Sequence, residues 1–333
     1  MKVLERIINV MTWLPLTFAV IMVIQVQAGA AIMGDTDFTL CAAAKAQNRS
    51  LALDAGAKKQ STALDASIGN PDMSQRMDRL LWAGDFGYGI YTIDTDTGTV
   101  KKMIDLSGTP GISSVINDLA YDPRNGLLYG ISGGSLFGEL NTLFTIDLCS
   151  PSLDVTLLGT VTPPHSSADS ISGLTFDSKG TLYGVEWNDL DDHLFTIDPV
   201  KLTIGKIYDL PSPANYNMND LARSPNSGKI LASRALDYAL FEITVPSGPT
   251  VLLGEDISAS FVWGLAYAPD SSRLYATESS GRILEIDPAN GAVLRVVATH
   301  SESFNGLEYV PEPATLLLLG LGGLVLRKRR RVL

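Results

Sequence analysis

From residue 80 to residue 310 the chain alternates apolar and polar residues in short runs, and turn residues separate these runs. Alternation with a period of two is typical of β-strands whose two faces differ. One longer pattern recurs, as in "NDLAYDPRNGLLYGIS" from Asn117 and "WGLAYAPDSSRLYATE" from Trp263. Its aligned leucines lie 42 to 55 residues apart and are Leu119, Leu174, Leu221, Leu265 and Leu307.

Each copy continues with a third and a fourth strand. The third strand reads "LFTID" at Leu143 and Leu194, "LFEIT" at Leu240 and "ILEID" at Ile283. A four-stranded unit with this period predicts the blade of a β-propeller. A single blade cannot bury both of its faces, so the blades must stack around an axis.

Four copies are complete, and one is divided between the two ends of the patterned region. Residues 80–106 contain three strands without a first strand, and residues 304–310 contain a first strand without a continuation. The sequence therefore predicts an all-β fold over residues 80–310: a β-propeller of five four-stranded blades with a split closing blade. A sixth blade would need strands from residues 34–79, where the pattern is absent.

Residues 1–28 read as a signal peptide that forms an N-terminal signal helix. Lys2 and Arg6 precede a long apolar stretch, and Val26–Ala28 suits cleavage by signal peptidase. An uncleaved membrane anchor is the alternative, and both readings send the following residues out of the cytoplasm. Residues 29–79 are rich in alanine and predict a poorly ordered or short-helical leader.

The chain ends in three short segments. Pro311, Glu312 and Pro313 come first, and 13 uncharged residues follow at 314–326. As a helix these 13 residues span about 20 Å, against about 30 Å of hydrocarbon in a bilayer, so the predicted transmembrane helix is short. The last segment is a basic stop-transfer signal made of Arg327, Lys328, Arg329, Arg330 and Arg331.

This order of Pro-Glu-Pro, apolar run and basic tail resembles the PEP-CTERM sorting signal of Gram-negative bacteria. The resemblance covers residues 311–333 and implies processing by an exosortase-type membrane protease. It further implies export, transient residence in the inner membrane and a cut near Pro311–Pro313. The chain would then be anchored at, or released from, the cell envelope or surface, or reach the extracellular matrix. A plain C-terminal anchor is the alternative.

The negative net charge of the chain restricts the molecules that it can bind. The net charge is −11, and without residues 1–28 and the basic tail 327–331 the chain has 18 basic and 35 acidic residues, which is near −17. An acidic body repels phosphate backbones and excludes nucleic acid as a partner. Cys41 and Cys149 would reach a compartment where disulfides form, and whether they pair is open.

One constellation of polar residues suggests a site. The residues two before the aligned leucines should begin the innermost strands and meet at one mouth of the central channel. They are Asn117, Ser172, Asn219, Trp263 and Asn305. The neighbouring Asp118 and Asp220 and the loop "EWNDLDDH", with Glu186, Asp189, Asp191, Asp192 and His193, add oxygens that suit calcium. The alternative is that Asn and Asp cap turns and the loop is merely solvated.

No catalytic set is recognisable, and the three histidines occupy unrelated repeat positions. The repeats resemble those of a mixed group of bacterial propellers. Some of its members are lactonase-like enzymes, which implies a metal at the channel mouth. Two functions stay open: a non-enzymatic binding or structural protein of the envelope, with a polysaccharide or protein partner, and a calcium-dependent lactonase-like hydrolase.

Overall fold

The computed structural model describes most of the patterned region. The described residues are 80–133, 140–148, 150, 152–164, 169–187, 193–210, 218–234, 239–245, 251–254, 260–268 and 272–310. The expected signal peptide, leader and sorting tail lie outside them, as do Cys41 and Cys149.

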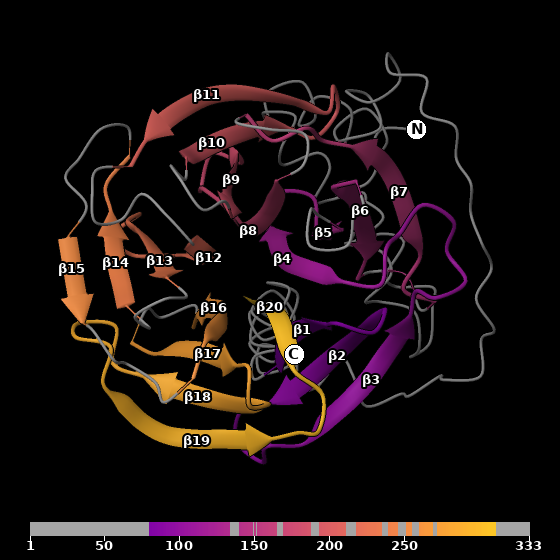
Figure 1. Ribbon diagram of the computed structural model, residues 1–333. Coiled ribbons are helices and arrows are strands. Elements are labelled where there is room, and N and C mark those ends of the chain that lie inside the picture. Colours follow the sequence, from indigo (N-terminus) through magenta and orange to yellow (C-terminus); the bar gives the residue numbers. More distant parts are fainter. Residues whose placement is uncertain are drawn as a thin grey trace, which may run out of the picture. The chain divides into compact units, whose positions relative to one another are not determined.

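The described residues form five antiparallel sheets of four strands arranged around one axis (Figure 1). Blade 1 contains β4 (Ile116–Asp122), β5 (Leu127–Ser132), β6 (Thr142–Asp147) and β7 (Val155–Thr160). Blade 2 contains β8 (Ser170–Phe176), β9 (Leu182–Trp187), β10 (His193–Asp198) and β11 (Thr203–Asp209). Blade 3 contains β12 (Met218–Arg223), β13 (Ile230–Arg234), β14 (Ala239–Ile243) and β15 (Val251–Gly254). Blade 4 contains β16 (Val262–Tyr267), β17 (Leu274–Glu278), β18 (Arg282–Ile286) and β19 (Val293–Thr299).

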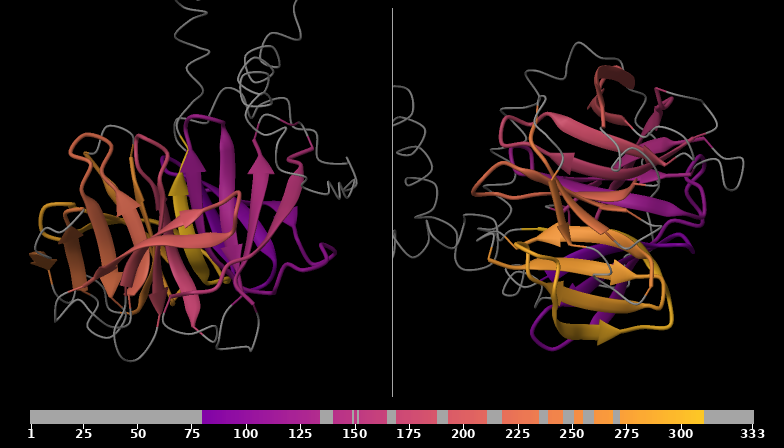
Figure 2. Two further views of the ribbon diagram at one scale, coloured as in Figure 1. Left: turned by 90° about the horizontal axis from the view of Figure 1, so that it is seen from above. Right: turned by 60° about the vertical axis from the view of Figure 1, so that its left-hand side comes forward.

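The fifth, closing blade is assembled from both ends of the patterned region. Its strand order is β20 (Phe304–Tyr309), β1 (Leu80–Asp85), β2 (Gly89–Asp94) and β3 (Val100–Asp105). The innermost strands β4, β8, β12, β16 and β20 are neighbours around the axis. In side view the strands run between two faces of the ring (Figure 2). The predicted five-bladed propeller with a split closing blade is confirmed.

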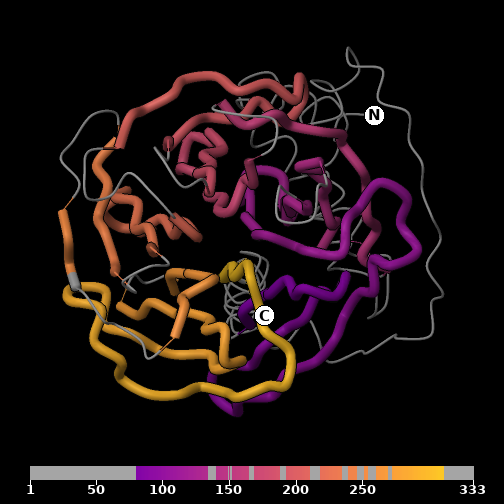
Figure 3. The backbone as a smooth tube through the Cα atoms, viewed as in Figure 1, coloured from indigo at the N-terminus to yellow at the C-terminus, as the bar shows by residue number. Residues whose placement is uncertain are grey.

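The ring closes through backbone pairing between residues far apart in the sequence. Strands β20 and β1 are antiparallel, with Leu81 opposite Tyr309 and Ala83 opposite Leu307. The indigo start and the yellow end of the propeller therefore lie in one blade (Figure 3). Because β1 begins where β20 ends, both ends of the propeller emerge on the same face.

Five hydrophobic clusters fill the spaces between neighbouring blades. Three of the clusters hold a buried third-strand aromatic residue: Phe144 between the closing blade and blade 1, Phe195 between blades 1 and 2, and Phe241 between blades 2 and 3. The repeated "LYG" is explained by this packing. A Cβ at Gly130 would lie 2.2 Å from the ring of Phe144, and one at Gly184 would lie 2.8 Å from the ring of Phe195. Glycine thus leaves room for the aromatic ring on the adjacent strand.

The outermost strands face solvent and carry charged side chains. Lys101 and Lys102 stand on β3, Lys206 on β11 and Arg295 on β19. Lysine and arginine on an edge strand discourage pairing with strands of other molecules. Since the outer strands resemble one another from blade to blade, a binding site is more to be expected at the two ends of the central channel.

We expect the closing blade to be a large source of stability. Phe304 is fully buried between the closing blade and blade 4, so Phe304→Ala should lower the free energy of unfolding by about 3–5 kcal/mol. The matched control is Val293→Ala on β19, because Val293 is 45% exposed, and its effect should stay within about 0.5 kcal/mol. Urea unfolding followed by tryptophan fluorescence measures both, and equal effects would contradict the packing described.

Candidate functional site

The five residues that begin the innermost strands line one cavity at the end of the channel, here called the strand-start mouth. Around it stand Asn117, Ser172, Asn219, Trp263 and Asn305, together with Phe86, Val115, Gly133, Ser170 and Trp187. Its interior volume is about 40 Å³. A cavity of this size holds a few water molecules and no larger ligand.

Three of these polar side chains connect successive blades. The amide nitrogen Nδ2 of Asn117 donates to the carbonyl oxygen of Ile171 at 2.9 Å. In the same way, Ser172 Oγ donates to Met218 O at 2.8 Å, and Asn219 Nδ2 donates to Val262 O at 2.7 Å. Each acceptor comes one residue before the equivalent position of the next blade. These hydrogen bonds give the three residues a structural role that connects neighbouring blades, which differs from the expected capping of turns.

The next residue along two of the inner strands is an aspartate, and both aspartates are fully buried. Asp118 accepts a hydrogen bond from the backbone N–H of Leu174 in blade 2. Asp220 accepts one from Leu221 at 2.6 Å and one from Leu265 in blade 4 at 2.5 Å. Each carboxylate therefore reaches the aligned leucine of the following blade.

Glycines make this reach possible. A Cβ at Gly173 would lie 2.8 Å from the Cα of Asp220, and a Cβ at Gly306 would lie 2.3 Å from the Cα of Asp118. The inner strands approach too closely for a side chain at these positions. The alternation of aspartate and glycine around the axis is thus a packing requirement.

The two aspartates also hydrogen-bond to each other. Burial raises the pKa of Asp118 to about 7. Burial and the neighbouring Asp118 raise the pKa of Asp220 well above its ordinary value. Asp118 Oδ1 has no other hydrogen-bond partner. A proton shared between the carboxyl groups satisfies this atom and removes one buried charge at neutral pH.

A third carboxyl group, that of half-buried Glu308, lies farther along β20. Glu308 accepts hydrogen bonds from the backbone N–H of Tyr121 at 3.2 Å and of Tyr309 at 2.9 Å. Burial raises the pKa of Glu308 to about 8, so the group is mostly neutral at pH 7. The shared proton and the mostly neutral Glu308 therefore lower the negative charge at the axis of the propeller.

Those carboxylates expected to hold calcium that the structure describes already have protein partners. Asp118 and Asp220 are engaged by backbone N–H groups, and buried Glu186 contacts the Nδ1 of His193 at 2.5 Å. Asp189, Asp191 and Asp192 lie outside the described residues. Within the described ranges, no three His, Cys, Asp or Glu side chains gather where they could hold a metal ion.

A serine motif passed unnoticed in the sequence. The segment "GISGG" from Gly130 matches the G-x-S-x-G pattern of a nucleophile elbow. Ser132, however, ends strand β5, is fully buried and accepts a hydrogen bond from the N–H of Ser113. A nucleophile elbow exposes its serine on a sharp strand-to-helix turn. Ser132 does not have this setting.

The strand-start mouth also carries an aromatic cluster, which we call the mouth aromatics: Phe86, Trp187, Phe261 and Trp263. The ring of Trp263 lies 5.8 Å from Phe86, 5.6 Å from Trp187 and 5.7 Å from Phe261, centroid to centroid. Phe86 and Phe261 are 37% and 38% exposed. Sequence reasoning placed Trp263 at the mouth, but it missed the other three rings because they occupy different repeat positions.

The shared proton predicts a pH dependence of stability. Between the unfolded pKa near 4 and the folded value near 7, the native state binds more protons, so stability falls as pH rises. Asp118→Asn stays neutral, so its stability should fall less between pH 5 and pH 8.5 than that of the wild type.

Urea unfolding across this pH range tests the expectation. Asp105→Asn is the matched control, because Asp105 lies on outer strand β3 and Lys102 lowers its pKa to about 2. This control should keep the wild-type slope above pH 5. Identical slopes for wild type and Asp118→Asn would contradict the buried, proton-sharing pair.

Comparison with known protein families finds a match at the C-terminal end of the chain. The PEP-CTERM protein-sorting motif matches residues 310–331. No curated protein matches the chain. Among the described residues, none forms a helix long and apolar enough to cross a membrane.

Solved structures share the fold only distantly. A chain in the crystal structure of a nidogen/laminin complex is 15% identical with a TM-score of 0.47, and the match covers 70% of this chain and 99% of that one. A protein of unknown function from Bacteroides caccae is 11% identical with a TM-score of 0.41, covering 66% and 72%. Another from Bacteroides thetaiotaomicron VPI-5482 is 14% identical with a TM-score of 0.44, covering 77% and 68%. These likenesses are too remote to indicate a function.

The motif begins at Val310, which is 2% exposed and packs in the cluster between the closing blade and blade 1. The sorting signal thus follows the innermost strand of the closing blade without a linker. It implies export, sorting to the cell surface or envelope, and processing by an exosortase. The chain is an exported, surface-sorted five-bladed β-propeller that carries a PEP-CTERM protein-sorting motif.

Proposed function

We propose that this protein is a non-enzymatic binding component of the cell envelope or extracellular matrix, and that the mouth aromatics bind a polysaccharide. The observation that carries the proposal is the cluster of four aromatic rings around Trp263 at the strand-start mouth. Aromatic residues provide large, flat contact areas with defined orientation and are enriched at binding surfaces. Sugar rings offer matching flat faces of C–H groups.

The position of the chain ends supports access to this surface. Leu81 pairs with Tyr309, so the sorting tail and the preceding leader both join the propeller at the face opposite the strand-start mouth. The innermost strands begin at the mouth and end at the face that carries the tail. While the tail holds the protein at the inner membrane, the mouth aromatics point away from the attachment point.

The shape of the mouth favours an extended ligand. The cavity beneath the rings is about 40 Å³, which excludes a sugar residue from the channel itself. The two phenylalanine rings are each more than one third exposed. A chain of sugars would therefore lie across the rings, with several weak stacking contacts along its length.

The chemistry of the mouth supports binding more than hydrolysis. A lactonase-like reaction would need carboxylates at the mouth that are open to a metal or to a substrate. Asp118 and Asp220 instead bond to backbone N–H groups, and buried Glu186 contacts His193. Asn117, Ser172 and Asn219 connect neighbouring blades.

We expect soluble neutral polysaccharides to retard the full chain, purified in detergent, in affinity electrophoresis. Dextran, laminarin and xyloglucan are the probes. Trp263→Leu should weaken the retardation at least tenfold, because it removes the central ring. Phe86→Ser should weaken it less, because Phe86 lies at the edge of the cluster. The matched control Val251→Ala, on outer strand β15, should behave as wild type.

Two results would contradict the proposal. One is the absence of retardation by every probe although the protein has its native fluorescence and melting behaviour. The other is retardation that Trp263→Leu leaves unchanged. Turnover of a lactone by the wild type that Asp118→Asn abolishes would favour the hydrolase instead.

A further inference from the structure

The opposite end of the channel holds a larger cavity, here called the strand-end cavity. Its interior volume is about 350 Å³, and residues from all five innermost strands line it. The residues two after each aligned leucine form its ring: Tyr121, Phe176, Arg223, Tyr267 and Tyr309. Four are aromatic and one is an arginine. Ligand pockets fall in this size range and typically combine aromatic walls with a few polar groups.

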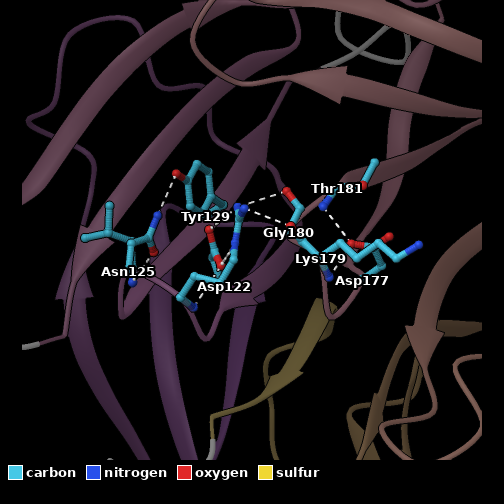
Figure 4. A network of polar contacts seen from close by, with 9 residues as sticks. Asp122, Asn125, Tyr129, Asp177, Lys179, Gly180 and Thr181 are labelled. Atoms are coloured by element: carbon cyan, nitrogen blue, oxygen red, sulfur yellow. Dashed lines mark hydrogen bonds and ion pairs between the residues drawn. The ribbon is translucent and has the colours of Figure 1, made fainter. Parts of the chain in front are cut away.

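Part of the rim is held in place by a network of polar contacts between blades 1 and 2 (Figure 4). Arg124 binds the carboxylate of Asp122 through Nε at 3.0 Å and Nη2 at 2.9 Å. Its guanidinium group also donates to the carbonyl oxygens of Lys179 and Gly180, each at 2.9 Å. Arg124 thereby fastens the turn after β4 to the turn after β8.

The second turn presents Asp177 to the cavity. Asp177 Oδ1 accepts hydrogen bonds from the N–H of Lys179 at 2.9 Å and of Thr181 at 2.7 Å (Figure 4). These bonds fix the carboxylate, and no donor among the described residues contacts Asp177 Oδ2. A fixed carboxylate with one free oxygen is a ready acceptor for ligand hydroxyl groups.

Arg223 contributes the opposite charge from blade 3. Its one polar side-chain contact among the described residues is a long one, from Nη2 to Ser178 Oγ at 3.5 Å. Within the described ranges Arg223 forms no ion pair, and its guanidinium group lies farther than 4.0 Å from the carboxylate of Asp177. Two unpaired groups of opposite charge thus line one cavity, and a guanidinium group suits a carboxylate in bidentate geometry.

The aromatic walls supply the remaining contacts. Tyr121 and Tyr267 are partly buried, and their hydroxyl groups have no hydrogen-bond partner in the described structure. Glu308 lies at the base of the cavity and bonds to two backbone N–H groups. Since burial keeps Glu308 mostly neutral at pH 7, it adds little repulsion toward an anion.

We propose that the strand-end cavity binds an acidic sugar residue, such as a uronic acid within a polysaccharide. The sugar carboxylate pairs with Arg223, its hydroxyl groups donate to Asp177 Oδ2, and its ring packs against the tyrosines. An aliphatic carboxylate would use Arg223 alone, and a neutral sugar would leave it unpaired. This site and the strand-start mouth lie at opposite ends of the channel, so the two proposals stand or fall separately.

Isothermal titration of the full chain in detergent tests the site with trigalacturonate and its methyl ester. The ester keeps the three sugar rings and their hydroxyl groups but replaces each carboxylate with an uncharged methyl ester. Trigalacturonate should bind at least tenfold more tightly than the ester. Arg223→Gln should remove this preference, and Asp177→Asn should weaken the acid and the ester alike. The matched controls are Lys206→Gln on outer strand β11, which removes a distant positive charge, and Trp263→Leu, which alters the other mouth.

Each contrary result overturns the proposal. Equal affinities for trigalacturonate and its ester would show that Arg223 does not recognise the carboxylate. Equal affinities for trigalacturonate and glutarate would show that the sugar ring is not recognised. A loss of trigalacturonate binding in Trp263→Leu places the ligand at the strand-start mouth. Absence of binding by wild type with a native melting transition excludes the site, and because Arg223 is partly exposed, Arg223→Gln should keep that transition.

Discussion

The pairing of β20 with β1 is the contact on which the rest of the structure depends. It joins residues such as Leu81 and Tyr309, which more than two hundred residues separate. Closing so long a loop costs conformational entropy, and the cost rises only slowly with length. The closing blade offsets this cost by filling two of the five inter-blade clusters, where Trp82 and Phe304 are fully buried. Without this pairing, blades 1 and 4 would each expose an apolar face.

Closure also decides how close the innermost strands come to one another. Glycines at 173, 264 and 306 leave no room for a Cβ against the neighbouring strand. The same tight approach buries Asp118 and Asp220 beside the axis. Two adjacent buried carboxylates cannot both be ionised, so they share a proton. Hydrogen bonds of Asp118 and Asp220 therefore connect the innermost strands in the middle of the propeller, between the two ends of the channel.

The two ends consequently have different chemistry. The strand-start mouth is small and aromatic, and its Asn117, Ser172 and Asn219 side chains form hydrogen bonds between blades. The strand-end cavity is larger, and Arg223 and Asp177 form no ion pair with any described residue. The sorting motif starts at Val310, directly after Tyr309 of that cavity. The two proposed binding faces therefore differ in position: one lies away from the tail and the other lies where the tail begins.

The sequence by itself determined the blade number, the split closing blade and the sorting signal. Strand alternation, repeat spacing and a contiguous terminal motif are local properties that survive without coordinates. Sequence also brought Asn117, Asn219 and Trp263 to one mouth, because equivalent repeat positions must meet around an axis. Their roles were decided by the tertiary structure, since the carbonyl group that Asn117 meets belongs to the next blade.

Neighbouring residues on a strand can face different surroundings, which is why Asn117 lines the mouth while Asp118 is buried beside the axis. Phe86, Trp187 and Phe261 share no repeat position, so no period could reveal their cluster. The ring of Tyr121, Tyr267 and Tyr309 was periodic in the sequence. Whether Arg223 and Asp177 pair with each other, however, depends on a distance between two blades, and only the closed ring sets that distance.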